Sequence, residues 1–329
     1  MRRATEPVST LRRQHGVAVI TALLLTTLAV TIVASLFWSQ QVQVRSMENQ
    51  RLHLQTKWIL RGALDWARLV LRQDGIDNRE YTTLTAVWNT PLAETRLDQY
   101  IERERVQGEI FDATLSGRII DATSRYNLTN LATGPKVSAE HVKIYQRLLV
   151  NLQLDPALAL KTAQAVAAGS DALPRMEGDT SPVVARTSAP LGLTQLDDLL
   201  SIPGYTPAIV GKLREFAIVL PADAQTVNVN TAPAEVIAAL MEGYSVSQAN
   251  ALVTRRKQAY FRQKIDFTNQ LFAGSGEGPA EAVYDVKSQY FLVLSRVRLD
   301  RAALDAEALV SRRLDDQAVK TTTVWVRQN

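Results

Sequence analysis

Residues 16–38, GVAVITALLLTTLAVTIVASLFW, decide how this chain is organised. From Val17 to Trp38 no side chain is charged. A helix of that length covers roughly 33 Å, about the hydrocarbon thickness of a bilayer. Four arginines and a single acid precede the segment. Because basic residues beside a spanning helix stay on the cytoplasmic side, the pattern predicts a single-pass membrane protein with its N-terminus inside and the rest of the chain outside.

Three interpretations of this segment compete. An uncleaved anchor requires only the length and the apolar character. A secretory signal requires a small-residue cleavage site, which Val33-Ala34-Ser35 offers, but the apolar run is longer than the roughly 7–15 residues of a signal core. In the third interpretation the abrupt junction at Gly16 is itself a processing signal, since glycine disfavours helix and favours an extended backbone there.

The junction resembles the leader of type IV prepilins and pseudopilins, which a prepilin peptidase cuts after the glycine and whose new N-terminus is methylated. The resemblance implies cleavage between Gly16 and Val17 and N-methylation of Val17. Most of that family carries glutamate five residues into the mature chain, where this chain has Thr21. A threonine hydroxyl can bond its own helix backbone, which suits a subunit at the tip of a filament. The alternative is that Thr21 has no special role and is merely tolerated in a membrane helix, as Thr26 is in the same segment.

Composition bounds the remainder of the chain. With 329 residues and 46% hydrophobic residues, it can build one or two ordinary cores beyond the anchor. The pI near 9.3 would suggest a nucleic-acid partner, but the leader holds four of 37 basic and one of 33 acidic residues, so the rest is close to neutral. Cysteine is absent, and so are the HExxH, GxSxG and P-loop motifs. We expect no enzyme activity and no small-molecule substrate.

The membrane helix is predicted to continue to about Gln73, with Gly75 as its stop. A stripe at helical spacing is formed by Leu52, Ile59, Ala63, Trp66 and Val70. The second half of the helix should therefore pack on a sheet. A short helix is predicted at 92–104, and strands at 109–115, 118–122, 290–299, 308–314 and 320–327, the first two forming a hairpin around Ser116-Gly117.

Two segments between these strands, 196–213 and 234–256, each read as a helix, a glycine turn and a second helix. DNA-binding versions of this hairpin use a second glycine to contact phosphate, and Thr206 and Ser245 stand there instead. Five basic residues near the second hairpin can contact phosphate: Arg255, Arg256, Lys257, Arg262 and Lys264. We favour the interpretation that they form a solvated helix face, and expect no nucleic-acid partner.

The loop between Gly169 and Pro190 carries three acidic residues, Asp171, Glu177 and Asp179. Calcium takes six to eight oxygen ligands, which such a loop can supply. The DxDxDG spacing is absent, so solvated acids and a metal site with these three ligands are the two alternatives.

Residues 226–237, TVNVNTAPAEVI, form a joint between the two hairpins. Thr231 can cap the helix that follows, and the side chains of Asn228 and Asn230 can tie the extended segment to backbone amides. The stretch closely resembles the NVNTA signature of the K class of minor pseudopilins of type II secretion (general secretion pathway protein K). That family shares the leader and lacks the glutamate at the place of Thr21, and Asn127-Leu128-Thr129 partly matches its second corner motif.

The resemblance implies an α+β fold in which a pilin-like long N-terminal helix packs on an antiparallel sheet, with a large all-helical insertion similar to SAM or helix-hairpin-helix domains. The expected parts are a leader (1–16), a transmembrane helix (17–38), the first part of the pilin-like domain (39–131), the insertion (132–280) and the C-terminal strands (281–329).

The implied role is to cap and help initiate the type II secretion pseudopilus, supporting protein export. The implied location is the Gram-negative inner membrane, with the C-terminal domain in the periplasm. Implied partners are the minor pseudopilins of the I and J classes, the pseudopilus tip and the prepilin peptidase, and the loop acids make calcium a candidate cofactor. The alternative is a membrane-anchored envelope DNA-binding protein built on the two hairpins.

Overall fold

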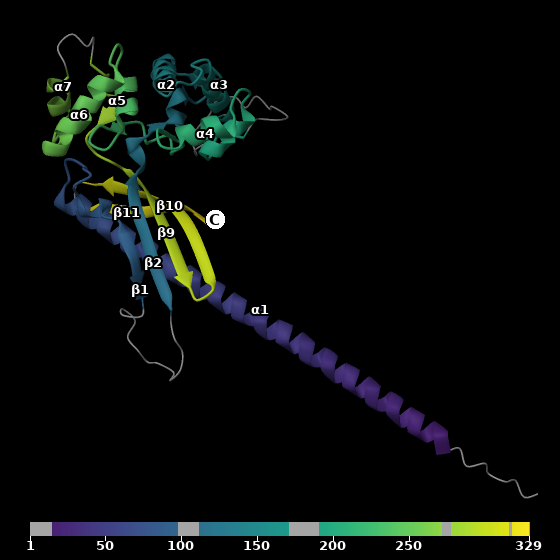
Figure 1. Ribbon diagram of the computed structural model, residues 1–329. Helices are drawn as coiled ribbons and strands as arrows, with labels where there is room; N and C mark the ends of the chain where they lie inside the picture. The colour runs from purple at the N-terminus through teal and green to yellow at the C-terminus, as the bar shows by residue number, and fades with distance from the viewer. Residues whose placement is uncertain (1–14, 98–111, 171–190, 272–277, 316–317, 329) are drawn as a thin grey trace, which may run out of the picture. The chain divides into compact units, whose positions relative to one another are not determined.

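The computed structural model describes residues 15–97, 112–170, 191–271, 278–315 and 318–328 (Figure 1). The chain divides into two compact units, residues 1–57 and 58–329. Helix α1 (His15–Asp77) begins in the first unit and ends in the second.

The first unit consists, in its described part, of the N-terminal portion of α1. Every side chain from residue 18 to residue 50 is exposed within the chain itself. Among the described residues, α1 is the one helix long and apolar enough to cross a membrane. An apolar helix without packing partners in its own chain is what a membrane anchor requires.

The second unit is built on a five-stranded antiparallel sheet of order β1-β2-β9-β10-β11. Its strands are β1 (Leu92–Arg96), β2 (Ala113–Asp121), β9 (Tyr290–Leu299), β10 (Ala302–Leu314) and β11 (Val319–Gln328). The last part of α1 lies along one face of this sheet (Figure 1). Their shared core contains Leu60, Leu64, Ala67 and Leu71 from α1, and Phe291, Val293, Val297, Ala308 and Val310 from the sheet. The predicted α+β architecture is confirmed, and β9 has the predicted bounds.

Two details of the predicted helix are wrong. The predicted buried stripe includes Trp66, but this side chain is 51% exposed, and Leu60 and Leu71 are buried instead. Gly75 does not end the helix, which continues to Asp77. A side chain at Gly75 would lie 2.8 Å from Cγ1 of Val319, so the glycine allows β11 to approach the helix.

The predicted hairpin at Ser116-Gly117 is also wrong, because both residues lie in the middle of the single strand β2. A Cβ at Gly117 would lie 2.6 Å from the carbonyl oxygen of Leu294, so this glycine allows β9 to pair closely rather than making a turn. Residues 92–96 form the strand β1, not the start of a helix. The predicted residues 98–104 and 109–111 lie outside the described part of the chain.

Residues 122–289 separate the neighbouring strands β2 and β9, and the longer elements described among them are helices. The described helices of this region are η3 (Ala122–Ser124), η4 (Leu128–Leu131), α2 (Ala139–Asn151), α3 (Leu158–Ser170), η5 (Leu196–Ser201), α4 (Pro207–Leu213), α5 (Ala234–Leu240), α6 (Val246–Gln258) and α7 (Lys264–Asn269). A further short helix, η1 (Val87–Asn89), lies before β1 and β2. Two-residue strands also occur: β3 (Tyr126–Asn127) with β6 (Ala217–Ile218), β4 (Ala132–Thr133) with β5 (Lys136–Val137), and β7 (Val227–Asn228) with β8 (Tyr284–Asp285).

Both predicted helical hairpins are present. Gly204 turns the chain between η5 and α4 with φ +107°, and Gly243 turns it between α5 and α6 with φ +72°. Thr206 and Ser245 cap the second helix of each hairpin, accepting hydrogen bonds from the amides of Ile209 and Gln248. Their side chains are therefore used to begin helices.

The helical region has its own core and is attached to the sheet through a smaller one. In the smaller core, Leu292 and Leu309 of the sheet pack against Ile218, Leu220 and Ala224. Successive residues of a strand point to opposite faces, so this contact uses the face of the sheet that α1 does not cover. The domain limits 39–131, 132–280 and 281–329 stay a prediction, as does the likeness to SAM domains.

Candidate functional site

The carboxylate of Asp121 is the centre of a buried polar joint in the second unit. Its Oδ2 accepts hydrogen bonds from Nδ2 of Asn228 at 3.1 Å, from Oγ1 of Thr231 at 2.5 Å and from Oγ of Ser288 at 2.5 Å. Its Oδ1 accepts from the amide and the hydroxyl of Thr123. Asp121 ends β2, whereas Asn228 and Thr231 belong to the NVNTA segment. The joint therefore connects the sheet to the helical region.

A second buried group, the guanidinium of Arg312 on β10, extends this joint to the long helix. Its Nη1 pairs with the carboxylate of Asp74 on α1. Its Nη2 donates to Oγ1 of Thr82 at 2.7 Å and to the carbonyl oxygen of Ser288. The guanidinium carbon lies 4.6 Å from the ring centroid of Phe291. Helix, sheet and helical region are thus held by one set of buried polar contacts.

Inside the NVNTA segment, the two asparagines bond backbone amides. Oδ1 of Asn228 accepts from the amide of Asn230 at 2.9 Å, and Oδ1 of Asn230 accepts from the amide of Phe261 at 2.9 Å. The predicted capping role of Thr231 is wrong: Pro233 is the N-cap residue of α5, without a side-chain cap, because the Thr231 hydroxyl donates to Asp121 instead.

The corner at Asn127 connects the start of the helical region to a later loop. Its Oδ1 accepts from the amides of Thr129 and Leu220, and its Nδ2 donates to the carbonyl oxygen of Ala224 at 3.0 Å. Asn127 is buried. A buried amide with its donor and acceptor both engaged fixes the path of two chain segments at once.

Arg256 differs from the other residues of the predicted basic face. Its side chain is buried and donates from Nη1 to the carbonyl oxygen of Val229 at 2.6 Å. Burial lowers the pKa of Arg256 to about 10. The prediction that all five basic residues are solvated is therefore wrong for this one. Arg256 lies at helical spacing from Ala249 and Leu252, the other buried residues of α6, and this spacing is the sequence signal that could have predicted its burial.

The predicted processing site lies at the beginning of α1. The helix already includes Gly16 and begins at His15, so the backbone at this junction is helical rather than extended. A glycine at a helix end costs little because the first amides lack helical partners in any case. Cleavage and methylation at Val17 stay a prediction.

Thr21 is satisfied within its own helix. Its hydroxyl donates to the carbonyl oxygen of Ala18 at 3.0 Å, as the hydroxyls of Thr26 and Thr31 do to theirs. The geometry is thus shared by other threonines of the anchor, and the role of Thr21 in assembly stays a prediction.

The predicted metal ligands Asp171, Glu177 and Asp179 lie outside the described residues. Within the described ranges, no group of three or more His, Asp or Glu side chains can hold a metal ion. Calcium binding by the loop stays a prediction.

The chain is similar to known proteins over most of its length. Family models described as Type II secretion system (T2SS), protein K, match residues 124–222 and 227–287. Type II secretion system protein K of Pseudomonas aeruginosa is 31% identical over 88% of this chain and 86% of its own length. The Aeromonas hydrophila protein of that name is 26% identical over 90% of this chain and 92% of its own.

A solved structure has the same fold. In the crystal structure of the GspK-GspI-GspJ complex from the enterotoxigenic Escherichia coli Type 2 Secretion System, the matched chain aligns with a TM-score of 0.62 at 18% identity. The match covers 86% of this chain and 99% of that one. The relatives named above are secretion-system proteins, in agreement with the expected lack of enzyme activity. This chain belongs to the type II secretion system protein K family, the K class of minor pseudopilins.

Proposed function

We propose that this chain caps the type II secretion pseudopilus and helps to initiate its assembly, and so supports protein export across the outer membrane. It is anchored in the inner membrane by α1, with its C-terminal part in the periplasm. Its partners are minor pseudopilins of the I and J classes, and a prepilin peptidase cleaves it between Gly16 and Val17.

One feature that agrees with the proposal is the hydrogen bond from the Thr21 hydroxyl to the carbonyl oxygen of Ala18. A buried carboxylate at this position needs a cationic partner in the membrane, and in a filament the N-terminal ammonium of a neighbouring subunit can supply it. A hydroxyl that is satisfied by its own helix needs no such neighbour. A subunit of this kind can stand at the end of the filament.

The observation that carries the proposal is the size of the inserted region. Residues 122–289 stand between two adjacent strands of the sheet, so the head is much larger than the sheet and helix alone. In a filament of closely spaced subunits, a neighbour stacks above each head except the last. A head of this size is accommodated best where no neighbour follows.

The partners are proposed by analogy with the matched crystal structure, which holds a related chain together with GspI and GspJ. The buried joint around Asp121 and Arg312 restricts the shape of the head, because its hydrogen bonds and ion pair fix how helix, sheet and helical region pack together. A rigid head presents the same surface to each partner.

Two measurements test the proposal on the full-length chain. Mass spectrometry of the protein from membranes should find Val17 as a methylated first residue, and Gly16→Ala should be inserted but poorly processed. An intact Met1, or Leu36 as the first residue, would contradict the pseudopilin processing. Electron microscopy of labelled protein should find it only at filament ends. Label at intervals along the filament would contradict capping even if processing were as expected.

A further inference from the structure

A polar cleft lies in the second unit between the sheet and the helical region. Its volume is about 360 Å³, within the range of about 300–1,000 Å³ that sites for small ligands occupy. Side chains of β2, β9, β10 and β11 form one wall, and Arg125 with residues from 194–197 and 214–219 forms the other. The residues of the buried joint around Asp121 and Arg312 do not line the cleft, so it is a separate feature of the head.

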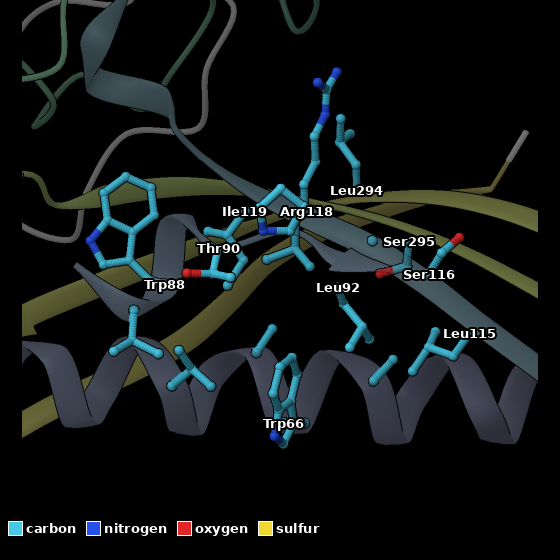
Figure 2. A pocket seen from close by; sticks show the side chains of 17 residues that line it. Trp66, Trp88, Thr90, Leu92, Leu115, Ser116, Arg118, Ile119, Leu294 and Ser295 are labelled. Atoms are coloured by element: carbon cyan, nitrogen blue, oxygen red, sulfur yellow. The ribbon is translucent and has the colours of Figure 1, made fainter. Parts of the chain in front are cut away.

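The sheet wall of the cleft carries a row of charged side chains. Arg118 on β2 and Glu307 on β10 are each paired with Leu294 on β9. Glu307 is also paired with Arg327 on β11. Residues directly opposite each other in a sheet point to the same face. The polar head of Arg118 points away from α1 (Figure 2), so this row lies on the face of the sheet that α1 does not cover.

Four charged side chains meet in the cleft without forming ion pairs. Arg118 and Glu307 belong to the sheet wall. Arg125, which follows η3, and Glu215, which follows α4, belong to the opposite wall. Within the described part of the chain, none of the four side chains forms an ion pair or a side-chain hydrogen bond. Burial lowers the pKa of Arg125, and the charges of Glu307 and Glu215 oppose this effect. The two acids therefore act on the guanidinium without contacting it.

The other charged side chains of the cleft are engaged within the chain. Arg214 pairs with Asp197 at 2.5 Å. The Arg327 guanidinium carbon lies 4.1 Å from the ring centroid of Trp325, and its Nη2 donates to the carbonyl oxygen of Thr194 at 3.0 Å. Trp325 is half-buried and forms the flat, apolar part of the wall. The unused charged groups are thus two guanidiniums and two carboxylates, whose charges are equal and opposite.

Unpaired groups of both signs match a neutral ligand that both donates and accepts hydrogen bonds. A guanidinium only donates, and an ionised carboxylate only accepts. An anion would be attracted by the two arginines but repelled by the two glutamates, and a cation would meet the reverse. A hydroxyl group donates and accepts at once. A ligand with several neighbouring hydroxyls therefore bonds to both kinds of group without charge repulsion.

We propose that this cleft binds a short, neutral oligosaccharide. Its hydroxyls accept hydrogen bonds from Arg118 and Arg125 and donate to Glu215 and Glu307, and such bonds to charged groups are stronger than those between neutral groups. The apolar face of one sugar ring packs against Trp325, because a large aromatic side chain offers a flat apolar contact. The inference goes beyond the proposed function, since it concerns a ligand of the head and not its place in the filament.

The first test measures binding of two neutral probes, maltotriose and N,N′-diacetylchitobiose, to the full-length chain. The protein is kept in a detergent without a sugar head group, and binding is followed by saturation-transfer NMR of the probe. At least one of the two should bind with a dissociation constant of about 1 mM or lower. Raising the salt concentration should leave its affinity unchanged, because a neutral ligand has no charge to be screened. Chitobiose, whose free amines are cationic, should bind more weakly than its acetylated form.

The second test places the ligand in the cleft by substitution. Glu307→Gln replaces a carboxylate by a neutral amide and should weaken binding about tenfold, as the loss of a hydrogen bond to a charged group does. Asp305→Asn is the matched control, because Asp305 lies two residues earlier on the same strand and the same face. It bonds Arg296 at 2.6 Å and does not line the cleft, so this variant should bind as the wild type does.

A second pair of variants tests the aromatic wall. Trp325→Leu should weaken binding, because it removes the flat surface on which the sugar ring packs. Trp66→Leu is its control, since Trp66 lines the apolar groove between α1 and the sheet (Figure 2) and should have no effect. Thermal unfolding of each variant checks that the head is folded.

Three results would overturn the inference. If the wild type binds neither neutral probe, the cleft is not a saccharide site, and the proposed function still stands because processing and filament position do not depend on this ligand. If Glu307→Gln and Asp305→Asn weaken binding equally, the saccharide does not lie in the cleft. If chitobiose binds more tightly than its acetylated form and salt weakens its binding, the cleft selects a charged ligand.

Discussion

Arg312 on β10 and Asp74 near the end of α1 form an ion pair in which both side chains are almost fully buried. The two residues are 238 positions apart in the chain. A buried charge is tolerated only when it is paired and hydrogen-bonded, and Arg312 also donates to Thr82 and Ser288. The pair therefore holds the end of the long helix against the sheet at a single position.

Asp74→Asn should destabilise the second unit strongly, because it leaves the Arg312 guanidinium buried without a counter-charge. The expected loss in the free energy of unfolding is about 3–5 kcal/mol, measured by urea denaturation. Asp65→Asn is the control: its ion pair with Arg68 is exposed, and such pairs contribute about 0–1 kcal/mol. Equal effects of the two variants would show that the buried pair is not what holds α1 on the sheet.

Thr231→Val tests the joint at Asp121. The substitution preserves shape but removes the hydroxyl that donates to the buried carboxylate, and the expected cost is about 1–3 kcal/mol. Thr254→Val is the matched control, because the Thr254 hydroxyl is exposed and bonds only the carbonyl oxygen of Asn250 in its own helix. Chemical denaturation of both variants measures the difference, and a cost at Thr231 no larger than at Thr254 would contradict the role of the joint.

The parts of the fold that could be predicted from the sequence depend on local pattern. The alternation of large apolar residues in 290–299 predicted β9 at both ends, and the turns at Gly204 and Gly243 were found because a positive φ requires glycine. Both rules involve only neighbouring residues, so no knowledge of distant contacts was needed.

Gly75 and Gly117 show why other parts were missed. Glycine is also needed where two backbones, or a backbone and a side chain, approach closely. Gly75 lies against the side chain of Val319 and Gly117 against the backbone of Leu294, and both partners are far along the chain. The sequence does not distinguish this use from a turn. Asp121 was missed for a similar reason, since its donors come from three separate segments. Arg256 could have been found, because helical spacing puts it on the buried face of α6.

Gly117→Ala should destabilise the sheet by about 1–3 kcal/mol, the typical cost of forcing extra atoms into a packed site. The added Cβ would meet the carbonyl oxygen of Leu294 at 2.6 Å, and this backbone is held in the sheet on both sides. Gly211→Ala should instead raise stability by up to about 1 kcal/mol, as alanine does in an exposed helix. Thermal unfolding of the two variants should shift in opposite directions, and a stabilised Gly117→Ala would contradict the close approach of β9.

The stability of the helical region should fall on mild acidification because of His141. Burial is the main cause that lowers the pKa of His141 below its usual 6.5, while Glu140 opposes this effect. The folded state therefore keeps the ring neutral at a pH where the unfolded chain already binds a proton. The contribution of His141 to stability is complete above about pH 6.5, the pKa of the unfolded chain, and is lost as pH falls through the lower pKa of the folded state.

His141→Gln is the comparison for this pH dependence, because glutamine keeps a polar group near the Tyr126 hydroxyl, which lies 3.1 Å from Nδ1 of His141. Melting temperatures measured across mildly acidic pH should fall more steeply for the wild type than for the variant. Parallel curves would show that His141 does not contribute to acid sensitivity.

Thr21→Glu is expected to leave protein export nearly unchanged. The glutamate would provide a carboxylate that a neighbouring subunit's N-terminal ammonium can pair with, and would remove the hydroxyl that bonds Ala18. If the large head between β2 and β9 determines where the subunit stands, the new carboxylate cannot move it into the body of the filament, because a neighbour stacked on the head would still clash. The variant should therefore remain at filament ends in labelled electron micrographs and support secretion at close to the wild-type rate. Thr26→Glu is the control, since the Thr26 hydroxyl makes the same kind of bond, to the carbonyl oxygen of Leu23. A glutamate at position 26 would place a carboxylate deeper in the membrane without a partner, which is costly. This variant should therefore insert poorly. Incorporation of Thr21→Glu along the filament would mean that residue 21, rather than the head, sets the position of the subunit.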